Sequence, residues 1–140
     1  MKNVKRFVLG LAAALTLAGC GLSQSISPAT TKSDLEAAGY KVSLKTEAEY
    51  QADPTALVVS AKASDGFQNY LTATTAENFL FAWYFDTIDH AGTWYEAHIA
   101  DFANIKLVGF GEDVQTASGT HNNVAYYGTA AAKDTAKFKI

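Results

Sequence analysis

The chain has 140 residues, of which 49% are hydrophobic and 12% aromatic, and it contains a single cysteine. This length suits one domain with its own core, and the apolar content excludes an intrinsically disordered chain. Fourteen acidic and eight basic side chains follow Cys20, so this part of the chain has a net charge of −6. Nucleic acids repel such a domain, and binding to DNA or RNA is therefore disfavoured.

The first twenty residues have the pattern of a secretory signal peptide. Three basic side chains occur before residue 7, and an uncharged apolar run extends from Phe7 to Leu17. This run is shorter than the ~20 residues that a helix needs to cross a bilayer. Two small residues, Ala18 and Gly19, then give a peptidase access to the backbone. We therefore expect export without a permanent transmembrane helix.

Leu17-Ala18-Gly19-Cys20 resembles the lipobox of bacterial lipoprotein precursors. The resemblance implies that a diacylglyceryl group is attached to Cys20, and that signal peptidase II recognises Leu17, Ala18 and Gly19 and cleaves before Cys20. A thiol suits this attachment because its thiolate is a strong nucleophile. Gly21 stands where an aspartate retains many Gram-negative lipoproteins at the inner membrane. The expected location is the extracytoplasmic face of the cell membrane, or the outer membrane if the cell is Gram-negative.

Residues 1–19 are thus expected to be a lipoprotein signal peptide, 20–31 a lipidated tether, and 32–140 a single α+β domain. The tether is small, polar and without periodicity. Ser33 and Glu36 fit a capping box for a first helix that stops at Gly39. The alternative is that this helix begins within the tether, with Pro28 in its first turn.

The middle of the chain predicts strands joined by turns. Strands are expected at 40–45, 57–63 and 70–74, with a loop or helical turn at 47–54 and a turn at Asp65-Gly66. Residues 78–85 give the strongest strand. Apolar residues occupy both of its faces, which predicts a central strand that is covered on both sides.

The last third of the chain predicts a helix, a hairpin and a final helix. The helix follows Asp86 and has one apolar stripe of Ile88, Ala91, Tyr95, Ile99 and Phe102. Residues 105–110 form a short strand or a connection. The hairpin pairs 114–120 with 124–128 around Asn122-Asn123, and Thr129 caps a helix that ends near Phe138.

These elements predict an α+β fold, with a mostly antiparallel sheet of about four to five strands and two to three helices. The segments DLEAAGYKV, FLFAWYFDTIDHA and NNVAYYGTAAA also loosely resemble small uncharacterised lipoproteins of Gram-positive bacteria. That resemblance implies no activity and no catalytic residue.

Two interpretations remain for the aromatic face of strand 78–85. If helices cover it, its rings belong to the core, which is where large aromatic side chains usually lie. If helices cover the face of Leu80 and Tyr84 instead, the rings form an exposed partner surface. That surface would consist of Phe79, Phe81, Trp83 and Phe85, together with Tyr126 and Tyr127 from the hairpin.

Polar residues on the helix after Asp86 raise the question of a metal ion. Asp86 and His90 are four residues apart and share one side of the helix, but His90 and His98 are too far apart in sequence for one ion. Nothing in the chain matches a metal-ligand pair, a nucleophile elbow or a phosphate-binding loop. We therefore expect no metal, no catalytic residue and no cofactor beyond the lipid on Cys20.

The sequence predicts a membrane-anchored lipoprotein whose extracytoplasmic domain binds an envelope protein or another envelope component. One alternative is a small metal-dependent or hydrolytic envelope enzyme built around Asp86, Asp89, His90 and Glu112. Another is a lipoprotein that captures a ligand for a transporter, although the chain is short for a two-domain clamp.

Overall fold

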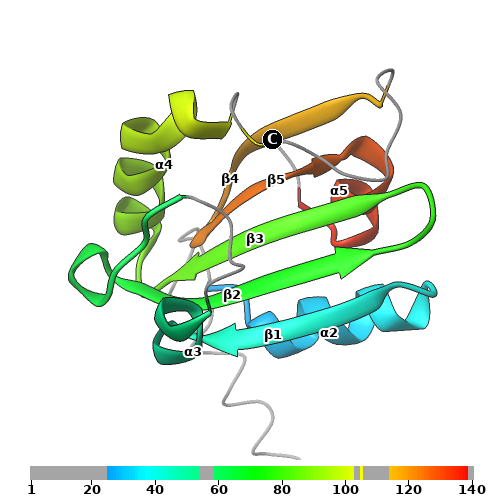
Figure 1. The fold of residues 1–140 in the computed structure, drawn as a ribbon, viewed down its shortest axis with the longest axis horizontal. Helices are drawn as coiled ribbons and strands as arrows, with labels where there is room; N and C mark the ends of the chain where they lie inside the picture. Colours follow the sequence, from blue (N-terminus) through cyan, green and yellow to red (C-terminus); the bar gives the residue numbers. More distant parts are fainter. Residues whose placement is uncertain (1–24, 54–58, 103–104, 106–113, 139–140) are drawn as a thin grey trace, which may run out of the picture.

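The computed structural model describes residues 25–53, 59–102, 105 and 114–138. Within them a five-stranded antiparallel sheet, ordered β1-β2-β3-β5-β4, packs with four α-helices (Figure 1). The strands are β1 (Lys41–Thr46), β2 (Phe67–Thr74), β3 (Phe79–Phe85), β4 (Thr116–His121) and β5 (Val124–Thr129). The helices are α2 (Pro28–Ala37), α3 (Glu47–Ala52), α4 (Ile88–Phe102) and α5 (Ala130–Thr135), and η1 (Ala63–Asp65) is a 3-10 turn. The predicted α+β class is confirmed.

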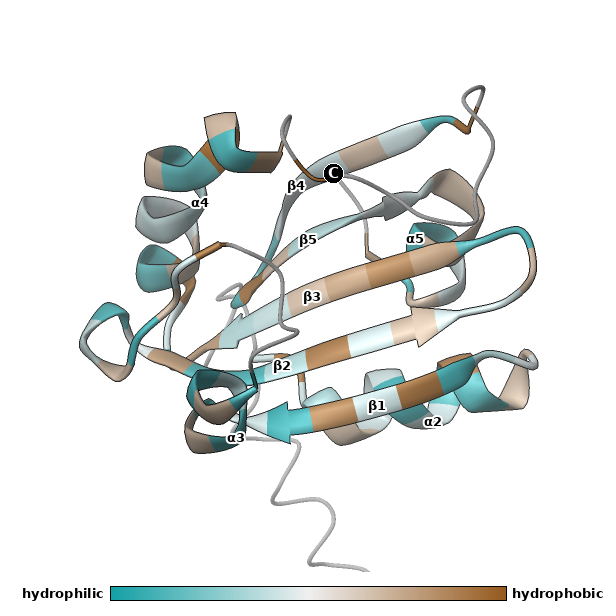
Figure 2. Ribbon diagram, in the orientation of Figure 1, coloured by the Kyte–Doolittle hydropathy of each residue, from teal (hydrophilic) through white to brown (hydrophobic). Residues whose placement is uncertain are grey.

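Helices cover both faces of the sheet. We call the face under α2 and α5 the first face, and the face under α3 and α4 the second face. The central strand β3 sends Leu80, Ala82 and Tyr84 into the first core, and its alternate side chains, including Trp83 and Phe85, into the second. Much of β3 is accordingly coloured as hydrophobic in Figure 2. The prediction of a central strand covered on both sides is confirmed.

The first helix starts earlier than the capping box predicted. Its N-cap is Ser27, whose hydroxyl accepts a hydrogen bond from the Ala29 N–H at 3.2 Å. Pro28 occupies the first helical position, where its missing N–H costs nothing. The predicted start at Ser33 is wrong, and the alternative with Pro28 in the first turn is confirmed.

The chain is already bound to the domain at Ile26. Its N–H donates to Asn123 Oδ1 at 2.6 Å, and the Asn123 Nδ2 donates to the carbonyl of Phe85 at 3.0 Å. The Ile26 side chain also packs against the first core. The folded domain therefore begins at or before Ile26, and the predicted boundary between residues 31 and 32 is wrong.

The predicted strand 57–63 is wrong for the residues that the structure describes, since 59–62 have no strand structure and η1 follows them. Side chains, instead of a neighbouring strand, bind the backbone here. The carbonyl of Val59 accepts from the Tyr50 hydroxyl at 2.6 Å, and the carbonyl of Ser60 accepts from Trp94 Nε1 at 2.8 Å. The apolar composition of the segment reflects its place in the second core.

The buried stripe of α4 is rotated relative to the predicted one. Ala91, Trp94 and Phe102 are buried, whereas Ile88 and Ile99 are 36% and 52% exposed. The indole of Trp94 is the largest apolar group on the helix, and its burial is accompanied by the hydrogen bond to Ser60. Burial of this ring turns the two isoleucines away from the core.

The hairpin of β4 and β5 turns at Asn122-Asn123 as predicted, and Asn122 has a φ of 54°. Helix α5 ends at Thr135, before the predicted end near Phe138. Of the segment 105–110, only Ile105 lies within the described residues, and it is not in a strand. Among the residues that the structure describes, no helix has both the length and the hydropathy needed to cross a membrane.

Candidate functional site

The predicted aromatic partner surface lies mostly in the core. Four of its six side chains are fully buried, namely Phe79, Trp83, Phe85 and Tyr126, while Phe81 and Tyr127 are half-buried. The ring of Trp83 packs between those of Trp94 and Phe102, with centroids 5.3 and 5.4 Å away. The interpretation of this face as core is correct. An exposed surface made of all six residues is excluded, because α4 covers the second face and Tyr126 lies in the first core.

The polar residues of α4 do not gather around one point. Asp86 Oδ1 lies 2.6 Å from His90 Nδ1, and this hydrogen bond is the main reason why the pKa of Asp86 is lowered. Both side chains are about half exposed and lie over Gly66, which has a φ of 84° and no space for a Cβ. The described residues contain no group of three or more side chains placed to hold a metal ion, and Glu112 lies outside them.

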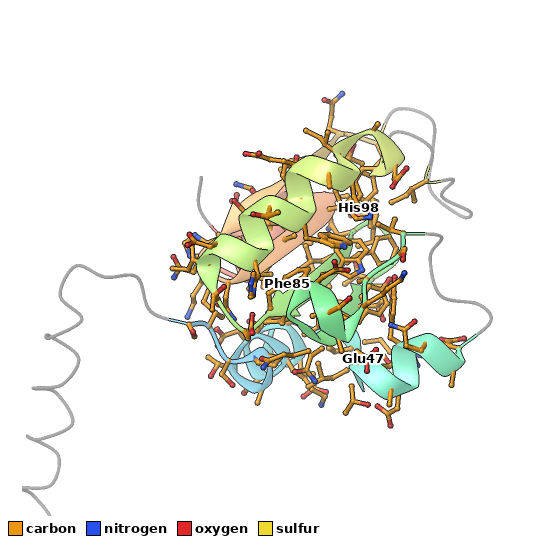
Figure 3. The ribbon with its side chains drawn as sticks, turned by 90° about the vertical axis from the view of Figure 1, so that its left-hand side faces the viewer. Glu47, Phe85 and His98 are labelled. Atoms are coloured by element: carbon orange, nitrogen blue, oxygen red, sulfur yellow. The ribbon has the colours of Figure 1, made fainter. Side chains whose placement is uncertain are left out.

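His98 has a separate environment. Its ring stacks on that of Trp94 with centroids 4.7 Å apart, and its Nδ1 lies 2.9 Å from the Trp94 carbonyl. Because a carbonyl only accepts hydrogen bonds, Nδ1 carries the proton. Figure 3 shows His98, on α4, and Phe85, at the end of β3, on the side of the helix that faces the rest of the domain. A hollow of about 200 Å³ next to His90 and His98 is lined partly by Trp94, whose Nε1 is already bonded to Ser60.

A larger groove, of about 600 Å³, lies between α4 and β4. We call it the α4–β4 groove, and it is lined by Tyr95, Glu96 and Ile99 from α4, by Ser118, Gly119 and Thr120 from β4, and by Tyr126 from β5. Within the described part of the chain, β4 pairs only with β5 and forms one edge of the sheet (Figure 1). The groove therefore adjoins a strand edge.

The register of the hairpin identifies the backbone groups at that edge. The two-residue turn makes His121 and Val124 a hydrogen-bonded pair, and hydrogen-bonded pairs then alternate along an antiparallel ladder. The backbone N–H and C=O groups of Thr116, Ser118 and Thr120 consequently point away from β5. They are a row of donors and acceptors that an extended segment could pair with.

Two tyrosine hydroxyls reach β4 beside this row. The Tyr95 hydroxyl is 2.7 Å from Ser118 Oγ. The Tyr126 hydroxyl passes over Gly119, where an added Cβ would lie only 3.1 Å from it. This hydroxyl is buried, and none of the residues that the structure describes forms a hydrogen bond with it. Burial is the main reason why the pKa of Tyr126 is raised. The proximity of Tyr95 and Asp134 raises it further.

The opposite edge of the sheet is built differently. Strand β1 carries Lys41 and Lys45, and Lys45 Nζ lies 3.6 Å from Asp53 Oδ2. Lysines on an edge strand discourage pairing with another chain. Strand β4, with the sequence TASGTH, has no lysine, arginine, carboxylate or proline. Of the two edges, β4 is the one that permits pairing.

No protein-family model, curated protein or solved structure matches the chain. The site is therefore assigned from its own geometry. Sequence reasoning missed the α4–β4 groove, although the uncharged hairpin strand was a signal for an unprotected edge. Of the residues predicted to contact a partner, Tyr126 lines the groove.

Proposed function

We propose that this protein is a lipid-anchored, extracytoplasmic binding protein that holds an extended segment of an envelope protein along β4. The observation that carries this function is the uncharged outer edge of β4 next to the α4–β4 groove. A segment that adds to this edge gains main-chain hydrogen bonds, and every second side chain points toward the groove. Binding, without any covalent chemistry, follows from such an arrangement.

The proposed anchor depends on Cys20 and the lipobox before it. In cells labelled with a palmitate analogue, the wild-type chain should carry the label and fractionate with membranes. The Cys20→Ala variant should lose the label and the membrane association. A variant that is processed and retained in the membrane like the wild type would contradict the anchor.

Strand addition is tested with photocrosslinking side chains in the whole chain, in the cells that produce it. Ile99 lines the groove and is 52% exposed, while Ile88 is 36% exposed on the same helix and does not line it. A photoreactive phenylalanine at Ile99 should crosslink one recurrent polypeptide that the same group at Ile88 does not capture.

A proline at Thr120 shows whether this capture depends on the strand edge. The Thr120 N–H points outward, so proline removes a donor that the sheet itself does not use. We expect Thr120→Pro to abolish the Ile99 crosslink and to preserve the near-ultraviolet spectrum of the folded domain. Equal capture from Ile88, capture that persists with proline, or no capture would each contradict strand addition.

A further inference from the structure

We infer that the segment bound at β4 is cationic, with a lysine or arginine beside Glu96, and that one of its polar groups pairs with the buried hydroxyl of Tyr126. This inference rests on the proposed function, because it names the class of ligand for the same groove. The ligand is thus an extended basic peptide segment of another protein. Three features of the groove lead to it.

The first feature is charge. Among the described residues that line the groove, Glu96 has the one carboxyl side chain, and none is a lysine or an arginine. The chain after Cys20 also has an excess of acidic residues, which attracts cations over a longer range. A second copy of this chain would instead bring two acidic domains, and two copies of Glu96, to the same edge. Charge complementarity therefore favours a basic partner over self-association.

The second feature is the hydroxyl of Tyr126. A buried hydroxyl without a hydrogen-bond partner destabilises the fold, because it has lost its bonds to water. The Tyr126 side chain belongs to the first core, its hydroxyl lies against Gly119 at the edge strand, and the residue also lines the groove. A carbonyl or a polar side chain of the bound segment can provide the missing partner. The Tyr95 hydroxyl is already bonded to Ser118, so the ligand gains most from Tyr126.

The third feature is the apolar part of the groove wall. Ile99 is half exposed, and the ring of Tyr95 lies one helical turn before it. Side chains of an added strand alternate between its two faces, so residues two apart face α4 together. The ligand should accordingly place apolar side chains at alternate positions, with the cation next to them at the level of Glu96.

The experiment is a selection from a phage library of random dodecapeptides. The bait is the whole chain, purified from the membranes of the producing cells in detergent, and the Thr120→Pro chain is the counter-selection bait. We expect enriched peptides with alternating apolar residues and at least one lysine or arginine. Fluorescence anisotropy with the best synthetic peptide then gives the affinity for each variant.

Matched pairs of substitutions separate the contacts of Glu96 and Tyr126 with the peptide from general effects on charge and folding. Glu96→Gln should weaken binding about twofold to fivefold and reduce its dependence on salt. Tyr126→Phe should weaken it about fivefold to tenfold. The controls are Glu77→Gln in the β2–β3 turn, and Tyr84→Phe, which removes another buried tyrosine hydroxyl, one that does not line the groove. Both controls should bind like the wild type.

The outcomes distinguish this inference from the proposed function. Acidic or uncharged peptides that still require the β4 edge would overturn the cationic ligand and leave strand addition in place. Peptides that bind the Thr120→Pro chain equally well, or no enrichment at all, would overturn strand addition itself. A dimer in light scattering that Thr120→Pro dissociates would show that the edge binds a second copy, and would overturn the basic partner.

Discussion

The buried polar groups on the two faces of the sheet differ in their hydrogen bonding. On the second face, the Trp83 Nε1 donates to the Tyr50 hydroxyl at 3.3 Å, and that hydroxyl donates to the Val59 carbonyl. The Trp94 Nε1 is bonded as well. On the first face, the Tyr126 hydroxyl is buried without a hydrogen-bond partner among the described residues, and the buried Tyr84 hydroxyl interacts with the Thr31 side chain.

This contrast shows that the rings of the second face connect segments as well as fill space. The Tyr50 hydroxyl and the Trp94 indole donate to the carbonyls of Val59 and Ser60, in a segment that pairs with no strand among the described residues. The first face is closed by α2 and by the short helix α5, and it buries the Tyr126 hydroxyl, which has no hydrogen-bond partner among the described residues. Proteins keep such groups where they serve binding or where water or a ligand can reach them.

The largest effect should come from Trp83→Ala on the second face. The ring is fully buried and touches those of Tyr70, Trp94 and Phe102. Its removal leaves a cavity and should lower the free energy of unfolding by about 3–5 kcal/mol, measured by urea denaturation. A loss below about 1 kcal/mol would mean that the second core is loosely packed.

The same chemical change on each face gives the sharpest test. Tyr50→Phe removes the hydroxyl that links Trp83 to Val59, and should cost about 1–3 kcal/mol. Burial raises the pKa of Tyr84, and a hydrogen bond with the Thr31 side chain opposes this rise. Tyr84→Phe removes a buried hydroxyl that links no second segment through a backbone carbonyl, and should cost less than Tyr50→Phe. Equal losses for the two variants would contradict this difference between the faces.

A smaller effect, a gain in stability, is expected from a substitution just after α5 on the first face. The residue after the C-cap of α2 is Gly39, with a φ of 94°, whereas the residue after the C-cap of α5 is Lys137, with a φ of 67°. A side chain in this left-handed region is strained, so Lys137→Gly should stabilise the domain by about 0.5–1 kcal/mol in thermal denaturation. The exposed ion pair of Lys137 with Asp34 offsets little of this gain. A melting temperature of Lys137→Gly below that of the wild type would show that the backbone at Lys137 is not strained.

The smallest expected effect is on the pH dependence of stability, and it comes from a carboxylate just before α4. Because the pKa of Asp86 is below its ordinary value of 3.8, the carboxylate stabilises the fold above that pH. This contribution is lost as the pH falls through the lowered pKa. Asp86→Asn should therefore flatten the fall in melting temperature between neutral and strongly acidic pH, and Asp89→Asn is the control. A curve identical to that of the wild type would show that the bond to His90 is not formed in solution.

The fold was predictable where one local pattern was decisive. Alternation identified β3, and Asn122-Asn123 identified the hairpin turn, since asparagine tolerates a positive φ. Prediction failed where distant side chains decide. Residues 59–62 are held by Tyr50, Gln51 and Trp94 instead of by a strand, and the bulk of Trp94 determines which side of α4 is buried.

The candidate site was harder to predict than the fold. The α4–β4 groove requires β4 to be an edge strand, and that follows from the pairing of β3 with β5, which are far apart in the sequence. The residues Tyr95, Ile99 and Gly119 have no unusual spacing. Their importance appears only when α4 is placed beside the sheet edge.

The bonds between Ile26 and Asn123 also limit how far the domain can be from its anchor. Six residue steps separate Cys20 from Ile26, and a fully extended chain of that length reaches only about 20 Å. With lipid on Cys20, as proposed, the domain moves within a thin layer next to the bilayer. A membrane-bound partner confined to the same layer reaches an effective concentration in the millimolar range, about that of two modules on a short linker. Strand addition that is weak in dilute solution could then hold most of the partner in the cell.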